Sequence, residues 1–170
     1  MFFSHKHIRS LMLTLISTCR LKDDVLLSEI LRYIILRGPV TAYRIARSLN
    51  IHFTQAYRKV TRLEHFGMVR RVANRRGDMF EATERGIIIC YYFNCANWEI
   101  LIDKLATRHQ LPRFALRAFL DAYLDHFKND AIIDDVPVMV FYALYKRAPV
   151  PAELMPAVTR HLLMPARASS

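Results

Sequence analysis

The chain has 170 residues, which allows one ordinary domain or a small domain with an appendage. Hydrophobic residues make up 53% of the chain, and this excludes a generally disordered protein. The 4 glycines and 7 prolines indicate long regular elements, mainly helices, joined by few loops. No apolar run approaches the roughly 20 residues that span a bilayer, so we expect no membrane association.

The formal net charge of +10 is placed unevenly along the chain. Residues 1–95 hold 16 Lys and Arg against 7 acidic residues, whereas residues 96–170 hold 9 against 8. A basic half joined to a nearly neutral half predicts that one part meets a polyanion and the other has a different role. The alternative is a generally basic protein, and the asymmetry argues against it.

The cysteines and histidines indicate neither a metal site nor a catalytic centre. Three cysteines are too few for a disulfide framework and favour a reducing, cytoplasmic compartment, with Cys90 and Cys95 as small buried residues. Asp121 and Asp125 share a helical face near His126, but we expect that face to be solvated. The histidines are scattered, so we expect a protein that is not an enzyme and holds no cofactor.

An apolar stripe with helical spacing lies in the segment 1–23. It predicts an amphipathic helix that packs on a partner or on the following domain. Early basic residues make the segment faintly similar to a signal peptide, but no small-residue cleavage site follows. The stripe consists of Ile8, Leu11, Met12, Leu15, Ile16 and Cys19.

Two helices are predicted before residue 50. The first runs from Val25 to Arg37, where Gly38-Pro39 ends it. Thr41 is a good cap for a short second helix, Ala42 to Leu49, and Asn50 suits the left-handed turn that follows.

A third helix and a hairpin follow. The helix opens at His52 or Thr54, runs to about Phe66 and ends at Gly67. Residues 68–73 and 79–83 are predicted strands, and the turn between them, residues 74–78, carries Arg75 and Arg76 at its tip.

The rest of the chain is predicted to be helical. A fourth helix begins at residues 83–86 and would reach about His109 if it is continuous, although Asn94 and Asn97 weaken that continuity. Further helices are expected over residues 113–128, 136–147 and 152–163. We expect this region to bury its aromatic side chains, which are Trp98, Phe114, Phe119, Tyr123, Phe127, Phe141, Tyr142 and Tyr145.

The order helix, helix, turn, helix, hairpin, helix is the topology of a winged helix-turn-helix domain. Residues 40–51 and 54–69, with Arg62-Leu63-Glu64, Gly67-Met68-Val69 and Thr83-Glu84-Arg85-Gly86, closely resemble bacterial and archaeal winged-helix regulators of the MarR, ArsR and PadR kind. The predicted fold is therefore mainly α with a small β-hairpin wing, plus additional C-terminal helices. The expected domains are an N-terminal helix (1–23), a DNA-binding domain (24–93) and a helical region for dimerisation or partner docking (94–170).

The third helix has the pattern of a recognition helix. Ala56, Val60 and Leu63 recur at core-facing positions, and polar residues occupy the other faces. Gln and Arg bond bidentately to adenine and guanine edges, while threonine and tyrosine hydroxyls donate to phosphates. Phe53 falls where such proteins usually have a polar residue, and it either packs on the wing or touches a thymine methyl. The predicted DNA contacts are Thr54, Gln55, Tyr57, Arg58, Thr61 and Arg62, with Arg75 and Arg76 on the wing and Arg44 and Arg47 on the second helix.

These features predict a sequence-specific, double-stranded DNA-binding transcription regulator, associated with the nucleoid and acting as a homodimer on a palindromic site. The alternatives are a winged-helix protein-interaction subunit of transcription or replication machinery and a general chromosome-binding protein. A small-molecule effector is left open. The apolar stripes Ile8-Leu11-Leu15 and Ile87-Tyr91-Trp98-Leu101 are the expected dimer contacts.

Overall fold

The structure, a computed structural model, describes residues 21–75 and 77–163. These residues form two compact units that divide between Trp98 and Glu99. The N-terminal amphipathic helix predicted for residues 1–23 lies almost wholly outside the described residues, and so does Arg76. Each unit is described by itself below.

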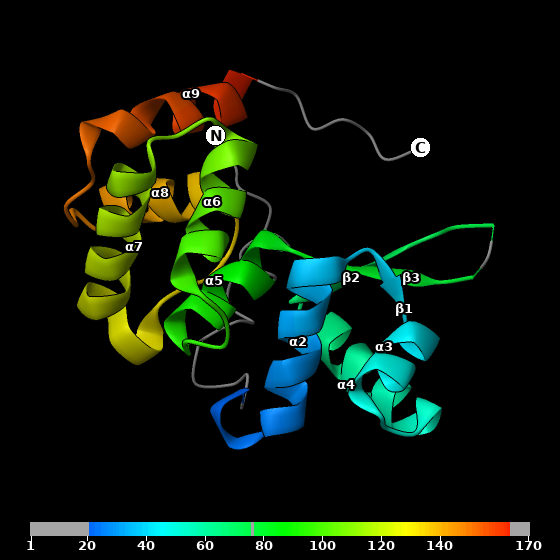
Figure 1. Ribbon diagram of the computed structural model, residues 1–170. Coiled ribbons are helices and arrows are strands. Elements are labelled where there is room, and N and C mark those ends of the chain that lie inside the picture. The colour runs from blue at the N-terminus through cyan, green and yellow to red at the C-terminus, as the bar shows by residue number, and fades with distance from the viewer. Residues whose placement is uncertain (1–20, 76, 164–170) are drawn as a thin grey trace. The chain divides into compact units, whose positions relative to one another are not determined.

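The first unit is a winged helix (Figure 1), as predicted. The strands β2 and β3 form the hairpin that projects from its helices as the wing. After a 3₁₀ turn at Leu21–Asp23, its elements are α2 (Val25–Arg37), β1 (Val40–Thr41), α3 (Ala42–Leu49), α4 (Phe53–His65), β2 (Val69–Val72), β3 (Met79–Ala82) and α5 (Glu84–Tyr92).

Short polar side chains start three of these helices. Asp24 accepts a hydrogen bond from the Leu27 amide at 3.0 Å, and Thr41 accepts one from the Arg44 amide at 3.2 Å. Thr83 caps α5 through the Gly86 amide at 3.1 Å. These bonds satisfy amides that the first helical turn leaves without a partner.

Left-handed residues stop two of the helices. Asn50 follows α3 with φ 53°, and Gly67 follows α4 with φ 69°. The limits predicted for α2 and α3 are confirmed to the residue, because a cap and a stop signal mark each of them.

The sheet has one strand more than the sequence predicted. Its order is β1-β3-β2, all antiparallel, with Val40 opposite Phe80 and Arg71 opposite the same Phe80 on the other side. The prediction of a two-stranded hairpin was incomplete. Strand β1 has only two residues, too few for the sequence to show the alternation of apolar and polar residues that marks a strand. Its pairing with β3 joins the wing to the segment between α2 and α3.

The core of this unit is aliphatic with one large ring. Ala56, Val60 and Leu63 of α4 are fully buried, which confirms the face predicted for them. The other fully buried members include Leu27, Ile30, Leu31, Ile45, Met68, Phe80 and Ile88.

The helix predicted to run from Thr83 to about His109 is not continuous. Helix α5 ends at Tyr92, and Asn94 has φ 54° in the turn that follows. A disulfide joins Cys90, in the last turn of α5, to Cys95 in that turn. Cys90 is buried, as expected, but Cys95 is only half-buried and the expectation of no disulfide was wrong. The helix end brings the two residues to a Cα–Cα distance of 5.0 Å, within the range that a disulfide bridges.

The second unit consists mainly of helices in its described part. Tyr123 donates a hydrogen bond to the Ile132 carbonyl at 2.7 Å and ties α7 to the segment before α8. Its main elements are α6 (Trp98–His109), α7 (Arg113–Phe127), α8 (Val136–Tyr145) and α9 (Met155–Leu163), with short 3₁₀ turns at Lys128–Asp130 and Ala152–Leu154.

The aromatic side chains of this region do not all enter the core, contrary to the prediction. Phe119 and Tyr123 are buried, but Trp98, Phe114, Phe141 and Tyr145 are 37–74% exposed. Aliphatic residues fill the space instead, and those fully buried include Leu105, Leu116, Leu120, Ile133, Met139 and Val140.

Part of the stripe expected to form dimer contacts after the wing is buried within the single chain. Ile87 and Leu101 are 4% and 0% exposed within a single chain, so they serve the core. Within the described ranges, no helix is both long enough and apolar enough to cross a membrane.

Candidate nucleic-acid interface

Helix α4 presents a polar, cationic face opposite its buried one. Thr54, Gln55, Arg58 and Thr61 are exposed, whereas Ala56 on the same helix is fully buried. This division follows from helical periodicity, which places residues three and four apart on one face. An open surface hollow over the face is lined by Gln55, Tyr57, Arg58, Lys59, Thr61 and Arg62.

Helix α3 carries a second group of exposed cations beside its cap. Arg44 and Arg47 are exposed and line another open hollow together with Thr41, Tyr43 and Ser48. Helices α3 and α4 pack against each other through buried residues such as Ile45 and Ala56, so both polar faces belong to one rigid helix-turn-helix.

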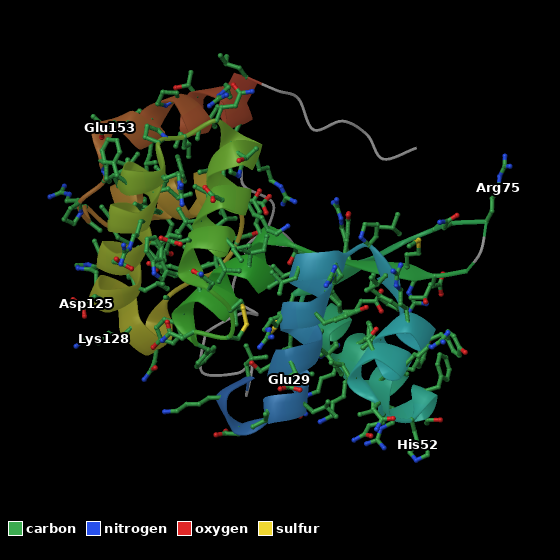
Figure 2. The ribbon with its side chains drawn as sticks, in the orientation of Figure 1. Glu29, His52, Arg75, Asp125, Lys128 and Glu153 are labelled. Atoms are coloured by element: carbon green, nitrogen blue, oxygen red, sulfur yellow. A yellow bond between two sulfur atoms is a disulfide. The ribbon has the colours of Figure 1, made fainter. Side chains whose placement is uncertain are left out.

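The wing adds a cation at a distance from these helices. Arg75 is exposed in the turn between β2 and β3, and Figure 2 shows its side chain pointing away from the end of the hairpin. Such a tip is placed to reach a groove or backbone next to the one that a recognition helix occupies.

One carboxylate neutralises part of the α4 face. Asp24 forms an ion pair with Lys59, and its Oδ2 lies 3.5 Å from Nη1 of Arg62. Arg62 also lies over the Phe66 ring, 6.0 Å from its centroid. Of the predicted contacts on α4, Arg62 is therefore the most engaged within the protein, and Arg58 is the exposed arginine on the same helix.

The environment of Asp24 favours its ionised form. Burial alone raises the pKa of this carboxyl group. That effect is outweighed by hydrogen bonds from Lys59 and the Leu27 amide and by the positive charges of Lys59 and Arg62. The pKa of Asp24 therefore lies below its ordinary value of 3.8.

Arg71 joins the wing to α4, a role that the sequence did not indicate. Its Nη2 lies 3.0 Å from Oε2 of Glu64 and its Nη1 lies 2.8 Å from Oδ2 of Asp78. Hydrogen bonds with Glu64 and with Tyr57 raise the pKa of Arg71, and its guanidinium covers the Phe80 ring at 5.3 Å. The charge of Arg71 is thus paired within the protein, although the residue is exposed.

One of the two predicted phosphate donors already has a hydrogen-bond partner. The Thr61 hydroxyl donates to the Tyr57 carbonyl at 2.9 Å, and the Tyr57 side chain favours the charged form of Arg71. Both side chains remain exposed. A phosphate only accepts hydrogen bonds, so the Thr61 hydroxyl would have to release the Tyr57 carbonyl in order to donate to one.

Phe53 is a half-exposed ring at the start of α4. Its ring stacks on Tyr57, one helical turn further along α4, with the centroids 5.9 Å apart and an interplanar angle of 28°. The side chain is 52% exposed. The ring partner of Phe53 is thus on its own helix, and about half of the side chain is open to solvent.

The described residues contain no group of three or more His, Cys, Asp or Glu side chains arranged to hold a metal ion.

The matched family agrees with this architecture. Residues 27–79 match a family model described as FaeA-like protein. The match runs from α2 to the first residue of β3 and so includes α3, α4 and most of the wing. FaeA-like proteins are winged-helix-like regulators, so the match is compatible with a DNA-binding regulatory domain. It does not name the MarR, ArsR or PadR families, and no curated protein and no solved structure matches the chain.

Proposed function

We propose that the winged-helix unit binds double-stranded DNA in a sequence-specific manner and that the protein is a transcription regulator, not an enzyme. The exposed face of α4 carries the proposal. There Gln55, Arg58 and Thr61 are exposed on the side of α4 opposite its buried apolar face, and further exposed cations lie on α3 and at the tip of the wing.

The chemistry of this face fits the edges of base pairs. An α-helix enters the major groove, where arginine bonds bidentately to guanine and glutamine to adenine. In the proposed complex Gln55 and Arg58 contact bases, while Thr54, Tyr57, Thr61 and Arg62 contact bases or phosphates. Arg44 and Arg47 of α3 face the backbone phosphates.

The wing supplies a separate contact. Arg75, together with Arg76, reaches the adjacent minor groove or its phosphates. The asymmetry of charge supports this assignment, because residues 1–95 carry almost all of the net charge of +10.

We further propose that the protein acts as a homodimer, as in the regulators that residues 40–69 resemble. Two copies would present two recognition helices to a palindromic site, and pairing raises the effective concentration of the second domain. Since Leu101 is buried within the chain, the exposed Phe141, Leu144 and Tyr145 of α8 are better contacts for a partner copy. Light scattering should give about twice the chain mass of 19.9 kDa, and a monomer that binds DNA tightly would overturn the dimer.

The deciding experiment is a selection of duplexes by the full chain. A random duplex library and genomic fragments are each enriched in parallel on immobilised protein. A regulator enriches one motif in both pools, and a chromosome-coating protein retains DNA without enriching a motif. A protein-interaction module retains no duplex. Retention without an enriched motif would overturn the sequence specificity, and no retention would overturn the proposal as a whole.

A further inference from the structure

Phe53 is an apolar ring in a polar neighbourhood. It is the first residue of α4, it is 52% exposed, and the residues beside it on the helix are His52, Thr54 and Gln55. Figure 2 labels His52, the residue before Phe53, at the outer edge of the winged-helix unit. Covering an exposed phenyl group of this size with an apolar group is favourable, because it removes apolar surface from water.

The ring is held in place on one side. Tyr57 stacks against it, one helical turn further along α4, with the ring centroids 5.9 Å apart. The Phe53 side chain is still 52% exposed, so part of the ring is free to meet a ligand.

The group that would contact the exposed part of the Phe53 ring follows from the position of Phe53 at the start of α4, an argument that rests on the proposed function. The N-terminal residues of a recognition helix contact base edges in the major groove. A phenyl ring has no hydrogen-bond donor or acceptor. Of the groups that base pairs present in that groove, the C5-methyl group of thymine is the apolar one.

We propose that Phe53 recognises the C5-methyl group of a thymine in the target site. The specificity at that base pair comes from apolar contact rather than from hydrogen bonds. The same chemistry is offered by 5-methylcytosine, which carries an identical methyl group on a different base edge.

The test uses a duplex enriched by the protein and replaces its thymines by deoxyuridine one at a time. Each replacement removes a single methyl group and keeps every donor and acceptor. At one position we expect affinity to fall about fourfold, the factor that corresponds to one buried methyl group. At that position cytosine and 5-methylcytosine are also compared, and this pair shows whether the methyl group acts on either base.

Two variants make the test specific to this side chain. Phe53→Ala should bind the thymine and deoxyuridine duplexes equally well. Phe114→Ala, which removes a 68% exposed phenyl group from the start of α7, should keep the fourfold difference. Thermal melting followed by circular dichroism checks that both variants fold as the parent does.

The outcomes separate the inference from the function beneath it. If the protein enriches a motif but no deoxyuridine weakens binding, or if Phe53→Ala keeps the difference, the methyl contact is wrong and the DNA-binding function stands. If no duplex is retained, both are wrong. A thymine-specific loss that vanishes only in Phe53→Ala supports the contact.

Discussion

Asp24, at the start of α2, forms an ion pair with Lys59 in the middle of α4. The same carboxylate accepts a hydrogen bond from the Leu27 amide at 3.0 Å. Asp24 therefore caps α2 and also binds α4 through Lys59. Through Asp24 the first helix of the winged-helix unit sets the position of the helix proposed to enter the major groove.

Replacing Asp24 should separate these two roles. Asp24→Ala removes the cap and the ion pair, and we expect the free energy of unfolding to fall by about 1 kcal/mol from the cap alone, and further from the unpaired Lys59. Asp24→Asn keeps a capping oxygen and should lose less. Urea unfolding measures both, and equal stability of the parent and Asp24→Ala would contradict the assignment.

The same carboxylate makes part of the stability depend on pH. Because the pKa of Asp24 is lower in the folded chain than its ordinary 3.8, ionised Asp24 stabilises the fold. This contribution is complete above the ordinary value and is lost as the pH falls through the lowered pKa. The difference in unfolding free energy between the parent and Asp24→Asn should therefore be constant at neutral pH and shrink below about pH 4.

Gly86 allows α5 to pass close to the main chain of Met68, the residue before β2. A Cβ atom there would lie 2.1 Å from the carbonyl oxygen of Met68, which is main chain and cannot turn aside. We expect Gly86→Ala to lower the unfolding free energy by about 3 kcal/mol, the upper end of the usual range for overpacking. Gly77→Ala is the matched control, since nothing lies within 4 Å there and only its φ of 111° is strained. Its cost should be on the order of 1 kcal/mol, and a similar cost at both glycines would refute the close approach.

Base contacts and backbone contacts should respond differently to truncation. Gln55→Ala and Arg58→Ala should each cost about 1–3 kcal/mol on the enriched site and relax base preference there. Arg75→Ala should weaken binding to all sequences more evenly, because a wing tip on phosphates carries no sequence information. Competition with single-base variants of the site measures this. If Gln55→Ala and Arg58→Ala leave both affinity and preference unchanged, α4 is not the recognition helix.

The disulfide predicts how many cysteines an alkylating reagent can modify. The chain has three cysteines, and the bond between Cys90 and Cys95 uses two of them. Alkylation of the unreduced protein in denaturant should modify one cysteine by mass spectrometry, and prior reduction should raise this to three. Three modified cysteines without reduction would show that the bond is absent from the isolated protein.

Local signals were sufficient to predict much of the winged-helix unit. A cap and a stop residue bound both α2 and α3, so their limits follow from residues such as Thr41 and Asn50. The exposed face of α4 follows from its helical period. What the sequence could not supply are relationships between distant residues, for example the contacts of Arg71 with Glu64 and Asp78.

The second unit was predicted less well for a similar reason. Its helices were placed correctly in outline, but an apolar period does not say whether an aromatic or an aliphatic residue fills the core. Phe141 and Leu116 have similar hydrophobicity, and only packing determines that Phe141 is exposed and Leu116 buried. In the first unit, the Cys90–Cys95 bond depends on the end of α5 before Asn94, and the sequence did not predict where that helix ends.

The most direct test of duplex DNA binding is the dependence of affinity on salt. Fluorescence anisotropy with the enriched duplex should show the logarithm of the association constant falling linearly with the logarithm of salt concentration, by ~0.9 for each phosphate neutralised. Replacing Arg44 and Arg47 by alanine should reduce that slope by about 1 for each phosphate that these two side chains neutralise. An affinity that stays constant between low and physiological salt would contradict the account.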